Sequence, residues 1–171
     1  VNDGKIKIYG VAEKFLRANL TFDEVIFPAE LGAELVLTIH NYTKQTLDKL
    51  DFNFGPFQLE LIIDESGHPF FVELEASAIG SYLSEWMVPG TSSNDMIFDS
   101  IKLATAEKVE TTVEKTALRS LLKYYYAEHL GIIDSISVSN INRRIMFKSY
   151  FNSGQHVKNK RMYIANSLIL G

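Results

Sequence analysis

Apolar and polar positions alternate with two different periods along the chain, and each period predicts one kind of element. Runs in which every second residue is apolar predict half-buried strands, whereas apolar residues three or four positions apart predict amphipathic helices. Strands are predicted over residues 5–11, entered from an Asn2-Asp3-Gly4 turn, and over 25–27, 57–64 and 69–75. Helices are predicted over residues 30–49 and 93–108, with a short helical piece around 82–87 that Pro89-Gly90 ends.

The pattern changes from Glu110 onward. A helix is predicted over residues 116–122, and short β-like runs follow over 123–128, 133–138, 144–151 and 162–170, with polar turns between them. Strands and helices segregated in this way are typical of the α+β class. We therefore expect an α+β chain in two parts, residues 1–108 with an antiparallel sheet and helices, and residues 109–171 as a small β-rich lobe.

The most informative segment is the predicted hairpin of residues 57–75. If Ser66-Gly67 forms a two-residue loop, Glu65 pairs with His68. Counting away from the loop along both strands then places Glu60 directly opposite Glu73. Side chains alternate along a strand, so Glu75 shares the face of Glu73. The other face is expected to point into a core and is entirely apolar: Leu59, Leu61, Ile63, Phe70, Val72 and Leu74.

Carboxylates directly opposite each other on a sheet destabilise it. At about 5 Å the repulsion is about 1 kcal/mol in watery surroundings and larger on burial. A divalent cation with oxygen ligands offsets that repulsion, and so does a proton shared between two carboxyl groups. The plain alternative is a solvated acidic sheet face whose carboxylates are partnered by lysines.

The stretch GPFQLELIIDESGHPFFVELEASAIG, residues 55–80, resembles the final active-site hairpin of ATP-grasp enzymes. In that family a strand carries a metal-binding acid, and a second strand ends in a motif like E-x-N-x-R. Glu60 matches the first acid, Glu73 the second, and Glu75 stands at the asparagine position. The segments before and after the hairpin follow the family's order, and GIIDSISVSN, residues 131–140, is similar to the C-terminal lobe of its amino-acid ligase branch.

The resemblance implies a fragment of an ATP-dependent carboxylate–amine ligase. Its substrates would be ATP, a small carboxylate and an amine, and Glu60, Glu73 and Glu75 would bind Mg²⁺ or Mn²⁺. The loop with Ser77, Gly80 and Ser81 would face substrate.

Two departures from the family pattern qualify that implication: Glu75 replaces asparagine, and Ser77 occupies the position of an arginine that contacts transferred phosphate. A larger gap lies upstream, because the chain lacks the nucleotide-binding lobe and the N-terminal substrate domain of the family. We therefore expect the missing N-terminal part of the same protein to be a partner, and this chain alone to be inactive. Two other readings stay open, a non-catalytic ATP-grasp-like nucleotide-binding or scaffold module and an unrelated α/β protein with an acidic metal hairpin.

Composition removes several other classes of function. The chain has no cysteine, which excludes disulfides, thiolate metal sites and cysteine nucleophiles. Its formal net charge is −4, and the basic residues between Arg143 and Arg161 are interleaved with apolar ones as on a solvated sheet face. No apolar run approaches the roughly 20 residues of a membrane helix. We expect a cytoplasmic protein without nucleic-acid or membrane partners, and a homodimer is compatible with this picture.

Overall fold

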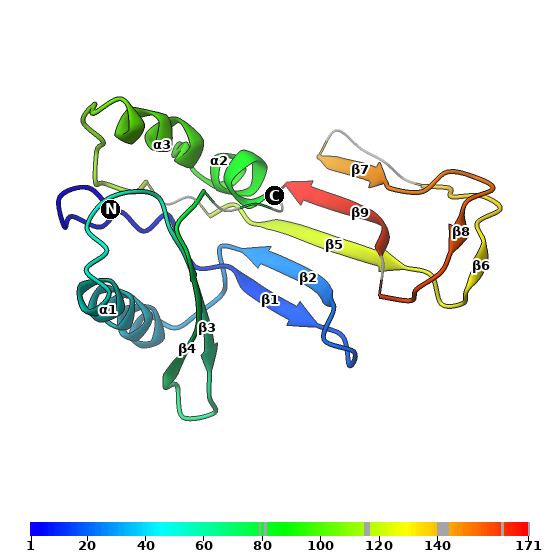
Figure 1. Ribbon diagram of the computed structural model, residues 1–171, viewed down its shortest axis with the longest axis horizontal. Helices are drawn as coiled ribbons and strands as arrows, with labels where there is room; N and C mark the ends of the chain where they lie inside the picture. The colour runs from blue at the N-terminus through cyan, green and yellow to red at the C-terminus, as the bar shows by residue number, and fades with distance from the viewer. Residues whose placement is uncertain (79, 81, 115–116, 140–143, 162, 171) are drawn as a thin grey trace.

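The computed structural model describes residues 1–171 except 79, 81, 115–116, 140–143, 162 and 171. Its helices and strands follow in the order β1 (Glu13–Leu16), β2 (Phe22–Phe27), α1 (Ala33–Lys49), β3 (Gln58–Ile63), β4 (Pro69–Glu75), η1 (Leu83–Met87), α2 (Val88–Thr91), α3 (Met96–Ala104), β5 (Ser120–Tyr126), β6 (Gly131–Ile132), β7 (Ile145–Ser149), β8 (His156–Val157) and β9 (Tyr163–Leu170). Figure 1 shows a central sheet with α2 and α3 along one side, α1 near β3 and β4, and β6 and β8 at the far end.

The central sheet is antiparallel and has the strand order β1-β2-β5-β9-β7. The expected α+β class with an antiparallel sheet and helices is confirmed. Two of its strands come from residues before 109 and three from residues after 108. The division into residues 1–108 and 109–171 thus passes between strands of one sheet, and it stays a prediction.

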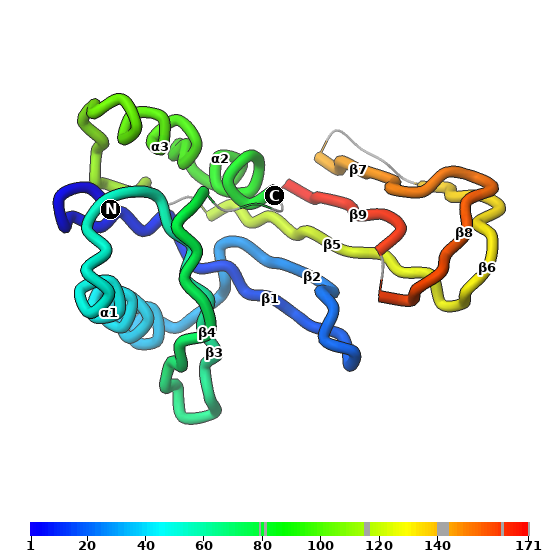
Figure 2. The backbone as a smooth tube through the Cα atoms, in the orientation of Figure 1, coloured from blue at the N-terminus to red at the C-terminus, as the bar shows by residue number. Residues whose placement is uncertain are grey.

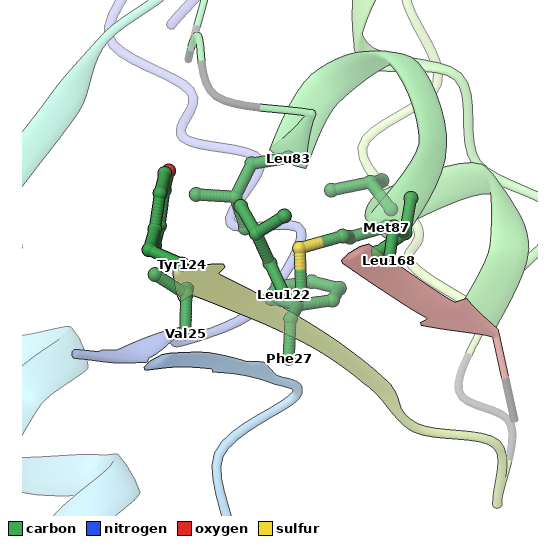
Figure 3. Close-up of a cluster of buried hydrophobic side chains, with 8 residues drawn as sticks. Val25, Phe27, Leu83, Met87, Leu122, Tyr124 and Leu168 are labelled. Carbon is green, nitrogen blue, oxygen red and sulfur yellow. The ribbon is translucent and has the colours of Figure 1, made fainter. Parts of the chain in front are cut away.

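The core lies between this sheet and the segment formed by η1 and α2. Figure 3 shows side chains of β2, β5 and β9 meeting Leu83 and Met87. Met87 and Leu122 are completely buried, and burying a side chain of this size stabilises the fold by about 1.5–3 kcal/mol. The core therefore fixes η1, the element that follows the β3–β4 hairpin in the chain.

Helix α1 begins three residues later than predicted and ends where predicted. It buries Ile39, Thr43 and Leu47 at successive i+4 positions, as its apolar spacing requires. Helix α3 is capped by Asp95, whose side chain accepts a hydrogen bond from the Phe98 amide, and it ends four residues before the predicted end. Among the described residues, no helix combines the length and apolarity that crossing a bilayer requires.

Four local predictions are wrong. Residues 6–12 form no ladder with other described residues, and the strand begins only at Glu13. Pro89 and Gly90 lie inside α2 because a proline is tolerated in the first turn of a helix. Of the predicted helix 116–122, the described residues 117–119 are outside any helix and the rest belong to β5; Thr116 lies outside the described residues. Residues 133–138 follow the two-residue strand β6 without forming a strand.

Candidate functional site

The β3–β4 hairpin pairs Glu60 directly with Glu73. Gln58 pairs with Glu75 in the same register, so Glu75 lies two residues from Glu73 along β4. Directly opposite residues on an antiparallel pair have Cβ atoms about 4.5–5.5 Å apart, on the same face. The register expected for the three acids is therefore present. A hairpin with Glu60 and Glu73 on opposite faces, which would have favoured an unrelated fold, is not what the structure has.

The turn that sets this register differs from the predicted one. Asp64 and His68 close a loop of three residues, because the Asp64 amide donates to the His68 carbonyl and Asp64 Oδ1 accepts from the Ser66 and His68 amides. Gly67 ends the loop with φ +81°, which glycine adopts without strain. The three-residue loop moves the pairing by one, and a bulge that leaves Val72 unpaired moves it back before Glu73.

The face of the hairpin expected to lie in a core is only partly covered. Leu59, Leu61 and Ile63 are half-buried, whereas Phe70 and Val72 are 55% and 45% exposed. The prediction that all six apolar residues point into a core is wrong for these two, because the three-residue loop pairs Phe70 with Ile62, on the face opposite to Leu61 and Ile63, and the bulge leaves Val72 unpaired.

Lys14 joins the acids, and sequence reasoning missed it. Its Nζ lies 2.6 Å from Glu60 Oε2, in an ion pair whose lysine and glutamate side chains are 25% and 34% exposed. Its ammonium also lies 5.3 Å from the centroid of the Phe22 ring. Lys14 sits on β1, which is in a different sheet from β3, so no local signal links the two. The lysine partner of the plain alternative is thus present at one of the three acids.

In the loop after β4, Ser77 is hydrogen-bonded to one of the acids. Ser77 Oγ donates to Glu75 Oε1 at 2.7 Å, so this glutamate is engaged from the position where the family pattern has arginine. Gly80 is exposed and has open space around its Cα, and its carbonyl accepts from the Leu83 amide as η1 begins. Ser81 lies outside the described residues.

Solved structures with the same arrangement of helices and strands identify the fold. The L-amino acid ligase from Bacillus licheniformis superimposes with a TM-score of 0.81 at 17% identity, over 98% of this chain and 46% of that one. Phosphoribosylglycinamide synthetase from Anaerococcus prevotii gives 0.73 at 14% identity, over 92% and 42%. The biotin carboxylase domain of the Hydrogenobacter thermophilus 2-oxoglutarate carboxylase was solved in complex with the magnesium salt of ADP, ADP and bicarbonate. It superimposes with a TM-score of 0.71 at 16% identity, over 100% of this chain and 40% of that one. The chain has the fold of the C-terminal part of an ATP-grasp enzyme.

The chain spans less than half the length of each of these ATP-grasp neighbours. No protein-family model and no curated protein matches the sequence. The likeness therefore concerns the fold, and the activity has to be argued from the site.

Two of the three carboxylates are suitable ligands for a magnesium ion. Mg²⁺ prefers oxygen ligands and is usually bound by one or two carboxylates together with substrate phosphates. Glu60 and Glu73 provide such a pair by their register. Within the described residues, no three side chains of histidine, aspartate or glutamate converge as a complete metal site would require. In this ATP-grasp fold, Glu75 instead accepts the hydrogen bond that Ser77 donates.

Proposed function

We propose that the chain is the C-terminal part of an ATP-dependent carboxylate–amine ligase. The observation that carries the proposal is the direct Glu60–Glu73 pair on the last hairpin of an ATP-grasp fold. Such a ligase activates a carboxylate by attack on the γ-phosphate of ATP, which releases ADP and leaves an acyl-phosphate. An amine then displaces phosphate and forms the amide bond.

In this reaction the protein acts mainly by placement and charge neutralisation. Glu60 and Glu73 would hold Mg²⁺ or Mn²⁺, with Glu75 beside them, and a bound ion would supply positive charge that offsets the charge of the phosphate groups. Lys14 offers a second positive charge at the same carboxylate. Ser77, Gly80 and Ser81 are proposed to form the loop that faces substrate.

The partners of the site follow from the same proposal. The N-terminal part of the same protein would supply the nucleotide-binding lobe and substrate domain, so this chain alone should bind ATP weakly and turn over nothing. Cytoplasmic location is part of the proposal, as is a homodimer, for which the dimeric biotin carboxylase domain from Hydrogenobacter thermophilus is a precedent.

The test is magnesium-dependent ATP hydrolysis and ligation by the full-length protein carrying Glu73→Ala. We expect turnover to be lost, because one of the two opposed carboxylates is gone. The matched control is Glu65→Ala, an exposed glutamate in the turn of the same hairpin, which should leave turnover unchanged. Unchanged turnover in Glu73→Ala would contradict the assignment.

A second function is favoured by one observation, the engagement of Ser77 with Glu75 where the family pattern has an arginine. On this reading the full-length protein binds nucleotide without catalysing a reaction. Calorimetry with ATP and Mg²⁺ should detect binding under both readings, and turnover separates them.

A further inference from the structure

The first residues of the chain form the turn of a β-hairpin. Asp3 and Gly4 have φ values of +47° and +73°, the positive pair that a two-residue hairpin loop of type I′ requires. Asn2 and Lys5 flank this loop and exchange both backbone hydrogen bonds, each at 2.9 Å. One arm of the hairpin runs from Lys5 towards β1. The other arm consists of Asn2 and Val1 only.

This short arm also pairs on its other side. The Val1 nitrogen donates to the Gly55 carbonyl at 2.8 Å, the Gly55 amide donates to the Val1 carbonyl at 2.9 Å, and Asn2 forms an antiparallel bridge with Phe54. The arm therefore lies between two antiparallel neighbours, as a central strand does. In Figure 2 the N-terminus lies where the segment leading to β1 and the segment leading to β3 come together.

Beyond this point the two neighbours diverge around a hollow of about 610 Å³. Every residue from Lys7 to Lys14 lines the hollow, and so does every residue from Pro56 to Ile63. A wall built by one face of a strand would contribute every second residue. Consecutive residues on both walls indicate that backbone edges face the hollow, and edges of this kind need hydrogen-bond partners.

Residues 7–12 have the extended conformation of a strand at the edge of a sheet. Lys7 Nζ and Tyr9 Oη both lie 2.7 Å from Asp99 Oδ2, so side chains two residues apart share one partner, as in extended backbone. Burial and the hydrogen bond to Asp99 raise the pKa of the Tyr9 hydroxyl. This anchor on α3 holds the segment open although it has no ladder partner within the described part of the chain.

The observed pairs fix a register for the hollow. If both antiparallel pairings continue without a bulge, the residue preceding Val1 pairs with Lys7 on one side and Pro56 on the other, and the eighth pairs with Lys14 and Ile63. These are the two runs that line the hollow. We propose that a β-strand from the polypeptide preceding Val1 fills the hollow and joins β3–β4 to the five-stranded sheet.

The proposal rests on the proposed function only in requiring a longer protein. The walls of the hollow are mostly apolar, so the strand should be rich in β-branched and aliphatic residues, and it should lack proline because both of its edges are paired. At its far end it would pass the Lys14–Glu60 ion pair, which spans the two walls. The strand would thus complete the sheet directly beside the acids.

Hydrogen exchange measured by mass spectrometry tests this directly, on residues 1–171 and on the full-length protein, without nucleotide or metal. In each run, the alternate amides that this register turns toward the hollow, from Lys7 to Glu13 and from Phe57 to Ile63, should exchange at least about tenfold more slowly in the full-length protein, because ladder hydrogen bonds protect amides. Two internal controls apply. Residues 64–68, the exposed turn of the hairpin, should exchange equally fast in both proteins, and the amides of β5, which lies between β2 and β9, should be equally protected in both, which shows that residues 1–171 are folded. Because no catalysis is measured, the result does not depend on whether the protein is a ligase.

The outcomes separate the possible occupants. Slower exchange of both runs in the full-length protein alone supports the strand. Equal, fast exchange in both proteins overturns it. Protection of these hollow-facing amides already in residues 1–171 also overturns it, and an increase of that protection with protein concentration would assign the hollow to a second copy of the chain.

Discussion

Replacing Lys14 by methionine should make the acidic pair a better site for a bare cation. In the structure the Lys14 ammonium lies 2.6 Å from Glu60, and both side chains are partly exposed. An ion pair in this setting stabilises by about 0.5–1 kcal/mol. A metal ion that binds Glu60 has to compete with that interaction. Removing the lysine should therefore tighten cation binding by roughly two- to fivefold, since 1.4 kcal/mol corresponds to a factor of ten.

Mn²⁺ titrated in low salt and followed by electron paramagnetic resonance measures this affinity without nucleotide. Methionine keeps most of the apolar stem next to the Phe22 ring, so packing changes little. Lys158→Met, at an exposed position directly after β8, is the control because it removes the same single charge at the end of the molecule far from the hairpin (Figure 1). Unchanged or weaker Mn²⁺ binding in Lys14→Met, or equal gains in both variants, would refute the reasoning that Lys14 and the cation share Glu60.

Two predictions concern stability and are checked by urea denaturation. Asp99→Ala leaves the Lys7 ammonium without its carboxylate, and both side chains of that pair are nearly buried, so the free energy of unfolding should fall by about 3 kcal/mol. Gly10→Ala places a Cβ 2.7 Å from the Phe27 ring and should destabilise by about 1–3 kcal/mol, whereas Gly90→Ala meets only the flexible end of a leucine at 3.0 Å and should cost less than Gly10→Ala. Equal losses in the two glycine variants would contradict the steric argument.

The elements that the sequence predicts well are those whose own pattern decides them. Helix α1 has buried residues at regular helical spacing, and β3 and β4 are neighbours along the chain with a glycine-containing turn between them. Local contacts of this kind leave a signal in the order of residues. The hairpin could be deduced for that reason, but its three-residue loop and its bulge could not, and the predicted pairing of Glu60 with Glu73 holds because these two irregularities compensate.

The first three residues of strand β5 could not be predicted in this way. Ser120, Leu121 and Leu122 follow residues that favour helix, and propensity alone extends the helix through them. In the structure β5 pairs with β2 on one side and β9 on the other, so it is a central strand of the sheet. Partners about a hundred and about forty residues away override the local preference. The Lys14–Glu60 contact escapes prediction for the same reason, since it joins two sheets across forty-six positions.

The position of the acids depends on two irregularities that cancel. In a ladder without a bulge, the three-residue loop would place Glu60 opposite Val72 and would turn Glu73 to the other face. The bulge at Val72 restores the Glu60–Glu73 pair. A bulge gives up ladder hydrogen bonds, and such features recur beside active sites, where they re-aim a side chain. The irregularity lies next to Glu73, and its effect is to bring two like charges together. Because like charges do not stabilise a hairpin, we infer that the pair serves to bind a ligand.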